Sequence, residues 1–181
     1  MYATSKIGTI LCLAAVLVPL RGFARPRPFP QEKKDYLTDS ESDKIRDALN
    51  PSERMKLYVS FADDRLKKLQ YELGRPVPER HHDDVLNGLI NAYSGCLDDA
   101  TDEIDEAKDK QADIHESLKL LESKSKEFLE GLEKIEQKGG PGLGGYKDNL
   151  EDAIQATEDT IAAARDAQKE MLPAPIRRKP S

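Results

Sequence analysis

The sequence contains no tryptophan, only four phenylalanines and only two cysteines in 181 residues. Sheet-based cores rely on aromatic and β-branched side chains. A chain that is poor in aromatics and rich in Glu, Asp, Lys, Leu and Ala instead favours long amphipathic helices. We therefore expect an all-α fold.

The N-terminal segment has the pattern of an export signal. Lys6 precedes an apolar run over residues 10–20, and the small residues Gly22 and Ala24 allow cleavage after Ala24. Such a run is too short to span a bilayer stably. We expect residues 1–24 to be a signal peptide and the mature protein to be periplasmic or extracellular, with an uncleaved N-terminal anchor as the alternative.

The scarcity of cysteine argues against a fold held together by internal disulfides. Cys12 lies within the predicted signal peptide, so the mature chain keeps Cys96 as its single cysteine. Cys96 precedes Leu97 in an amphipathic pattern, and we expect it to be buried; an intermolecular disulfide is the alternative. A catalytic thiol needs a neighbouring base, and no histidine lies close to Cys96 along the chain.

Charge is distributed unevenly along the chain. Residues 35–172 hold all but one of the 34 acidic residues, whereas the segments 25–36 and 173–181 are Pro-rich basic tails. A phosphate backbone requires a basic surface, so the acidic body disfavours nucleic-acid binding. We expect both tails to be solvated. The alternative is that their basic residues contact a membrane or the cell wall.

Residues 37–172 form the predicted helical domain, and caps mark its first two helices. A capping box formed by Thr38 and Glu41 predicts a helix over about 39–49. Asn50, which is followed by a proline, predicts a second helix over 51–73 with an apolar stripe at steps of three and four.

The clearest pattern is a heptad that runs through the middle of the sequence. Apolar residues recur there at alternating steps of four and three, which keeps one seam of a helix turned toward a partner helix. Its large apolar members, which we call the seam residues, are Leu86, Ile90, Tyr93, Leu97, Ile104, Ile114, Leu118, Leu121, Phe128, Leu132 and Ile135. Two polar members, Gln111 and Ser125, are interpreted as specifiers of register or partner.

The heptad predicts one continuous helix over about 79–138, with the acidic residues of 96–116 on its solvated side. A glycine-rich turn ends this helix, and the same alternating spacing of four and three residues resumes over 146–171. We expect a long central helix flanked by two shorter antiparallel ones, in a coiled-coil-like arrangement. The alternative is a four-helix bundle that folds back near 109–113, but this stretch has no glycine or proline and we recognise no helix start in it.

No motif in the sequence points to catalysis or to a cofactor. Glu79 and His82 have the E-x-x-H spacing of a metal-binding helix, and His81 is adjacent, but a bundle site needs a second such motif and further inward glutamates. We therefore expect no metal site, and these three residues are only candidates for a surface contact. Catalytic residues and cofactors are likewise not expected.

Two short segments resemble known families. Residues 49–69, LNPSERMKLYVSFADDRLKKL, resemble a helical segment of an uncharacterised family of exported bacterial proteins without an assigned activity. The motif LTDSE at 37–41 is similar to the L-T-x-x-Q motif of the periplasmic stress-chaperone family related to heavy-metal resistance proteins, with Glu41 in the place of the glutamine. That second resemblance implies helical hairpins that shield unfolded proteins.

These observations predict an exported, non-enzymatic helical scaffold or adaptor of bacterial type. It would act through contacts with a protein partner or by self-association. The alternative is a periplasmic chaperone or a metal-responsive stress protein.

Overall fold

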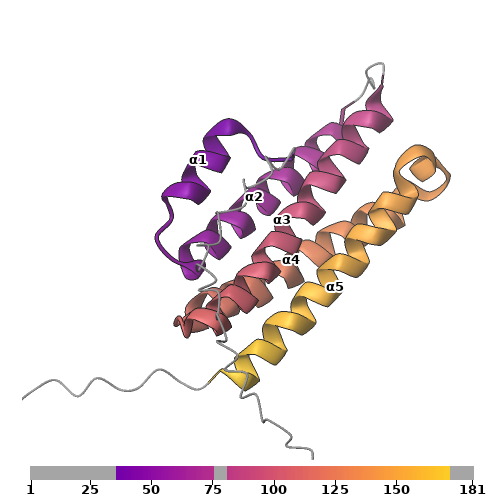
Figure 1. The fold of residues 1–181 in the computed structure, drawn as a ribbon. Coiled ribbons are helices and arrows are strands. Elements are labelled where there is room, and N and C mark those ends of the chain that lie inside the picture. Colours follow the sequence, from indigo (N-terminus) through magenta and orange to yellow (C-terminus); the bar gives the residue numbers. More distant parts are fainter. Residues whose placement is uncertain (1–35, 76–80, 172–181) are drawn as a thin grey trace, which may run out of the picture. The chain divides into compact units, whose positions relative to one another are not determined.

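The computed structural model of the protein describes residues 36–75 and 81–171, and within them the fold is entirely helical (Figure 1). The predicted all-α class is therefore confirmed. The elements are α1 (Asp39–Asp47), α2 (Pro51–Leu73), α3 (His82–Lys110), α4 (His115–Gly139), the 3-10 helix η1 (Gly140–Tyr146) and α5 (Lys147–Glu170). None of these helices has both the length and the apolar character needed to cross a membrane.

Several predictions concern residues outside the described ranges. The signal peptide over 1–24, the tail over 173–181 and Glu79 all belong to this group. Of the tail predicted over 25–36, only Tyr36 is described.

The predicted caps of α1 and α2 are confirmed. The Thr38 hydroxyl accepts a hydrogen bond from the Glu41 N–H at 3.2 Å, and the Glu41 carboxylate accepts one from the Thr38 N–H at 2.9 Å. The Asn50 side chain accepts from the Glu53 N–H at 3.0 Å. These bonds satisfy main-chain donors that the first turn of a helix leaves without partners. Helix α2 has the predicted bounds, and α1 ends two residues earlier than expected.

Helices α2 to α5 form a bundle in which α2 and α5 each pack against both α3 and α4. Contacts between helix ends fix the directions. Arg54, early in α2, pairs with Glu103, late in α3, and Glu122, early in α4, pairs with Arg165, late in α5. The bundle therefore consists of two antiparallel hairpins, α2–α3 and α4–α5, with α1 lying against α2.

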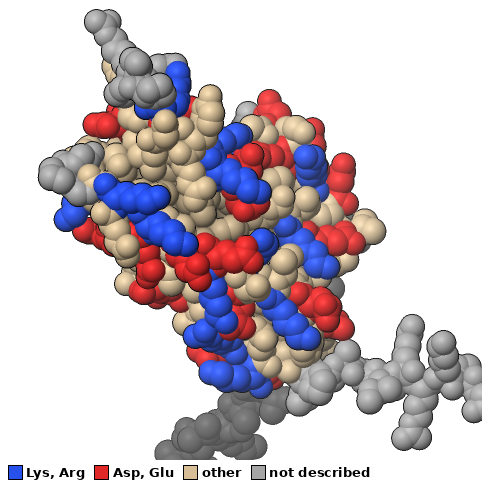
Figure 2. Space-filling model, turned by 180° about the vertical axis from the view of Figure 1, so that it is seen from behind, with Lys and Arg blue, Asp and Glu red and all other residues tan. Residues whose placement is uncertain are grey.

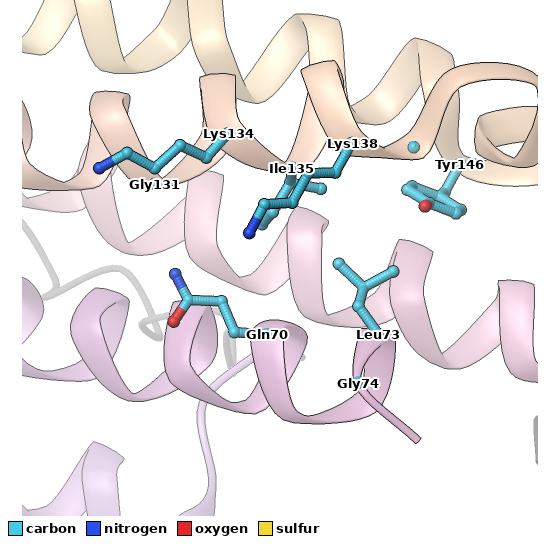
Figure 3. A pocket seen from close by; sticks show the side chains of 9 residues that line it. Gln70, Leu73, Gly74, Gly131, Lys134, Ile135, Lys138 and Tyr146 are labelled. Carbon is cyan, nitrogen blue, oxygen red and sulfur yellow. The ribbon is translucent and has the colours of Figure 1, made fainter. Parts of the chain in front are cut away.

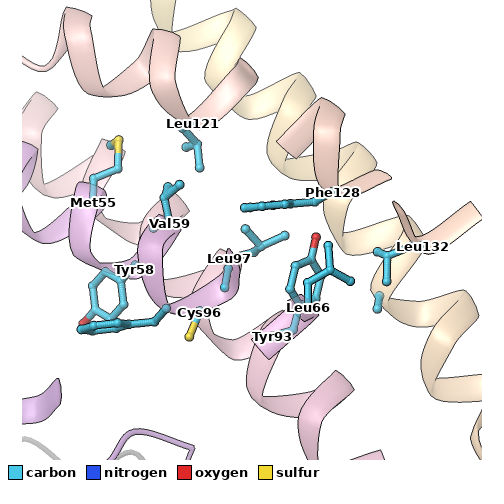
Figure 4. Packing of buried hydrophobic residues seen from close by; sticks show 14 of the residues in the cluster. Met55, Tyr58, Val59, Leu66, Tyr93, Cys96, Leu97, Leu121, Phe128 and Leu132 are labelled. Atoms are coloured by element: carbon cyan, nitrogen blue, oxygen red, sulfur yellow. The ribbon is translucent and has the colours of Figure 1, made fainter. Parts of the chain in front are cut away.

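Helices α3 and α4 face each other across the centre of the bundle. The rings of Tyr93 and Phe128 meet there edge to face, with centroids 5.8 Å apart (Figure 4). Leu97 and Leu121 are fully buried in the same cluster. This layer ties both hairpins into one core, because each hairpin contributes an aromatic ring and a leucine to it.

The continuous helix predicted over 79–138 is wrong, and the alternative, a four-helix bundle, is what the structure shows. Helix α3 ends at Lys110 and α4 begins at His115, so the chain folds back at the stretch 109–113 named for that alternative. Folding back buries both halves of the heptad in one shared core. It also ends the run of like charges, which destabilises a helix that continues through it.

A Schellman cap closes α3 without a glycine. Gln111 adopts the left-handed conformation, with φ of 51°. The N–H groups of Gln111 and Ala112 donate to the carbonyls of Lys108 and Ala107, at 3.2 and 2.9 Å. This is the bond pair by which a left-handed residue ends a helix. Gln111 therefore lies at the turn and is exposed, which corrects its predicted place in the seam.

Helix α4 has a cap that sequence reasoning overlooked. The Asp113 carboxylate accepts a hydrogen bond from the His115 N–H at 3.2 Å and lies 3.1 Å from the Nδ1 atom of the same residue. The bond to the main chain, followed by that to the ring, lowers the pKa of Asp113. Asp113 with Glu116 three residues later matches the pattern of a helix start. The pattern was therefore present at the bend.

The seam residues lie in the core of the bundle. Ten of the eleven are buried, and Ile135 is partly buried. Ser125, the other polar heptad member, is also fully buried, and its hydroxyl has no hydrogen-bond partner among the described residues. The heptad thus marks the core-facing stripe of both α3 and α4.

Candidate functional site

One hollow lies between the C-terminal ends of α2 and α4 (Figure 3). We call it the α2–α4 pocket. Its volume is about 660 Å³, which falls within the range of small-molecule sites. Its lining residues are Gln70, Leu73, Gly74, Gly131, Lys134, Ile135, Lys138, Gly139 and Tyr146.

The pocket has an apolar floor, and side chains of α2 approach α4 closely at Gly131. Leu73 and Ile135 are both only partly buried, so their side chains are available to a ligand. Gly131 brings α4 close to α2, since a Cβ atom there would lie 3.3 Å from Gln70 Nε2 and 3.4 Å from Leu66 Cδ2. A larger residue at position 131 would therefore press on the side chain of Leu66 and on that of Gln70, which lines the pocket.

Four polar groups surround this floor. Lys134 has its ammonium 3.6 Å from the Glu130 carboxylate, whereas Lys138 forms no ion pair with any described residue. The side chains of Gln70 and Tyr146 likewise have no hydrogen-bond partner among those residues. Burial, followed by the negative charge of Asp83, raises the pKa of Tyr146, so its hydroxyl stays protonated.

A second hollow, the α1–α2 groove, lies where α1 meets the start of α2. It has a volume of about 490 Å³ and is lined by Lys44, Asp47, Ala48, Glu53, Lys56 and Leu57. Leu49, in the link between the two helices, is 88% exposed. The other exposed large apolar side chains of the described residues are Tyr71 and Val85.

The lysines that lack a carboxylate partner are found at these two hollows. Ion pairs within 4.0 Å involve most lysines of the described residues (67, 68, 108, 110, 119, 124, 126, 134, 147 and 169). Lys44, Lys56 and Lys138 form none, and each lines one of the two hollows. The α2–α4 pocket therefore carries a basic side chain, Lys138, without a carboxylate partner, whereas the two lysines of the α1–α2 groove share that groove with the carboxylates of Asp47 and Glu53.

A polar clamp attaches α1 and the residues before it to the bundle. Arg65 donates to both carboxylate oxygens of Glu41 and, at 3.3 Å, to the Tyr36 carbonyl. The Tyr36 hydroxyl donates to the Asp99 carboxylate on α3. The Tyr36 ring also packs on Gly95, where a Cβ atom would lie 2.9 Å from it. Tyr36 is therefore packed on the domain and does not belong to a solvated tail.

The described metal candidates do not converge on a site. His81 is exposed, has a left-handed backbone with φ of 67°, and places Nδ1 3.1 Å from the Asp84 carboxylate. His82 begins α3. Among residues 36–75 and 81–171, no three His, Cys, Asp or Glu side chains are arranged to hold a metal ion.

Comparison with protein-family models, with curated proteins and with solved structures found no match. The two resemblances, over 37–41 and 49–69, therefore stay predictions.

Sequence reasoning identified Ile135 but missed the other side chains of the α2–α4 pocket. A local signal was present, because Lys134 and Lys138 are four residues apart and flank the last seam residue. The contributions of α2 and Tyr146 have no such signal, since only the folded bundle brings them to the end of α4.

Proposed function

We propose that this protein is an exported, non-enzymatic helical adaptor that binds a protein partner through the α1–α2 groove and Leu49. The observation that carries the proposal is the 88% exposure of Leu49 beside a groove that contains apolar and unpaired basic side chains. Export rests on the signal pattern over 1–24, and the absence of a recognised catalytic motif in the sequence supports a binding role.

The local backbone holds Leu49 in a fixed place. The Ala48 N–H donates to the Lys44 carbonyl at 3.1 Å, which closes α1. The Leu49 N–H donates to the Glu53 carboxylate at 2.9 Å, and Asn50 caps α2 immediately afterwards. Main chain that is already held in place loses little conformational entropy on binding, so Leu49 is suited to be an anchor.

The groove indicates the chemistry of the partner. Ala48 and Leu57 provide apolar surface next to Leu49, while Lys44 and Lys56 have no ion-pair partner among the described residues. A segment that carries both apolar and acidic side chains complements this surface, because its acids can pair with Lys44 and Lys56, which form no ion pair with the Asp47 and Glu53 carboxylates of the same groove. The apolar groups of such a segment leave water on binding. A second copy of this acidic protein can provide such a segment, so self-association is one form of the proposal.

Site-specific photo-crosslinking tests the adaptor proposal. A photoreactive amino acid is placed at position 49 and, as a matched control, at position 71, because Tyr71 is also exposed, at 70%, but lies near the other end of α2. We expect one discrete crosslinked product from position 49 and none from position 71. The mass of the crosslinked product distinguishes a partner protein from a second copy of the chain.

A charge reversal makes this test specific. Replacing Lys44 and Lys56 by Glu in the position-49 chain is expected to abolish the product, because the groove then repels an acidic partner. Equal crosslinking from positions 49 and 71 would argue against the groove. A wide range of crosslinked proteins from position 49 would favour the chaperone interpretation instead.

A further inference from the structure

The α2–α4 pocket lies away from the α1–α2 groove and has a different chemistry. The two hollows are at opposite ends of α2, which is 23 residues or roughly 35 Å long at the usual helical rise. A ligand in the pocket therefore leaves the groove accessible.

The shape of the pocket favours a small molecule with an apolar part. Leu73 and Ile135 present partly exposed apolar surface from α2 and α4, and Tyr146 closes one side with a ring that is only 6% exposed. Burying such surface against a ligand is favourable at about 25 cal/mol per Å². Main chain at Gly74 and Gly139 forms part of the wall, so no side chain from these positions fills the space.

The charges around the pocket favour an anionic head on that molecule. Figure 3 shows Lys138 extending from α4 over Ile135 toward α2, with the Gln70 amide on the facing helix. Because Lys138 has no carboxylate partner among the described residues, an anion can bind it without displacing an existing ion pair. Gln70 and Tyr146 add hydrogen-bond donors that lack partners in the described structure.

The surrounding surface disfavours a large polyanion. Acidic and basic side chains are interspersed over the face drawn in Figure 2. A nucleic acid or a charged membrane surface attracts an extended basic patch, whereas this pocket offers two lysines of which one is already near a glutamate. We propose that the α2–α4 pocket binds an anionic amphiphile, a small molecule with a carboxylate or phosphate head at Lys138 and an apolar body over Leu73 and Ile135.

Titration of the full chain with matched probes tests this inference. Decanoate and decyl phosphate carry both features, decanol lacks the charge, and inorganic phosphate lacks the apolar body. We expect decanoate or decyl phosphate to bind at least roughly tenfold more tightly than decanol and phosphate, since hydrogen bonds to charged groups contribute at least that factor. Comparing the two amphiphiles shows which head the pocket prefers. Calorimetry gives the affinities, and NMR shifts of Ile135 and Tyr146 locate the site.

Substitutions test which side chains contact the bound amphiphile. Lys138→Gln is expected to weaken amphiphile binding roughly tenfold, and Tyr146→Phe to weaken it by a smaller factor because it removes only the hydroxyl. Lys119→Gln is the matched control, since Lys119 lies on the same helix, is 66% exposed and does not line the pocket. It should bind like the parent chain. Circular dichroism of each variant verifies that the helices are retained.

Three results would overturn the inference. The first is that decanol binds as tightly as decanoate and decyl phosphate, and the second is that Lys138→Gln binds like the parent chain. The third is that neither amphiphile binds at about millimolar concentration, where even a free energy of binding near −4 kcal/mol is measurable.

Discussion

The guanidinium of Arg65 donates to both carboxylate oxygens of Glu41, with Nη–O distances of 2.9 and 2.6 Å. Glu41 is at the same time the capping-box residue of α1, where it accepts from the Thr38 N–H. One carboxylate therefore both starts α1 and attaches it to α2. The remainder of α1 is mostly exposed, and Ile45 is its only buried residue.

The first prediction is that Glu41→Gln releases α1 from the bundle. Losing a charge-assisted pair at a mostly buried site should lower the free energy that holds α1 in place by about 2 kcal/mol. Hydrogen exchange should become faster in α1 and stay unchanged in α3. Asp43→Asn is the control, because its ion pair with Arg46 is exposed and should contribute less than about 1 kcal/mol.

The same carboxylate predicts a pH dependence. Burial by itself would raise the pKa of Glu41, but hydrogen bonds from Arg65 and Thr38 outweigh it and lower the pKa from 4.5 to about 2. A depressed folded-state pKa stabilises the attached state above pH 4.5, and this contribution is lost as the pH falls from 4.5 toward 2.

Exchange rates of the α1 amides, corrected for intrinsic pH dependence, should therefore be constant above pH 5 and increase below pH 4.5. In Glu41→Gln this increase should be absent. If both chains showed the same pH profile, another carboxylate would control the attachment of α1.

A second prediction concerns the turn between α3 and α4. Gln111→Gly should raise the free energy of unfolding by about 0.5–1 kcal/mol, because glycine adopts the left-handed conformation without the steric cost of a Cβ atom. The matched control is Gln155→Gly in the exposed interior of α5, which should lower it by about 1 kcal/mol. Urea unfolding measures both. A destabilised Gln111→Gly protein would contradict the observed cap.

A third prediction concerns the hydrogen bond between Tyr93 and Thr157, whose oxygens lie 2.7 Å apart in the core. Thr157→Val should lower the free energy of unfolding by about 1–3 kcal/mol, because it leaves the buried Tyr93 hydroxyl without this partner. Adding Tyr93→Phe should restore part of that loss, since no polar group is then stranded. Chemical unfolding of the two single variants and the double variant forms the cycle, and strict additivity would show that the two hydroxyls do not interact.

The fourth prediction is that the thiol of Cys96 is protected in the native protein. Cys96 is fully buried, so labelling should be slow in a Cys12→Ser chain and become fast in denaturant. If the native protein were labelled as fast as the unfolded chain, Cys96 would not be buried in the core.

Features encoded by neighbouring residues were predictable from the sequence. The caps at Thr38 and Asn50 need only a few adjacent side chains, and both are present as expected. The bend at Gln111 was missed although Asp113 and Glu116 carried a helix-start pattern, because the unbroken heptad was given more weight. A heptad records which side of a helix is buried, and this side is the same whether the helix continues or folds back onto a shared core.

The candidate sites depend on contacts between distant segments. The sequence placed Leu49 at the end of the predicted helix 39–49, whereas α1 ends at Asp47, and the exposure of Leu49 depends on how α1 lies on α2. The α2–α4 pocket requires Gln70, Lys138 and Tyr146 to meet at one end of the bundle. No spacing within the sequence specifies that meeting.

The turn at residues 111–114 is the only covalent connection between the hairpins α2–α3 and α4–α5. Each hairpin presents its apolar face to the other, and nothing in that contact requires both hairpins to belong to one molecule. If the turn straightened, two chains could exchange hairpins and rebuild the same core twice, with the heptad running through one uninterrupted helix in each chain. The extended helix expected from the sequence would then be the central helix of each chain in a domain-swapped dimer.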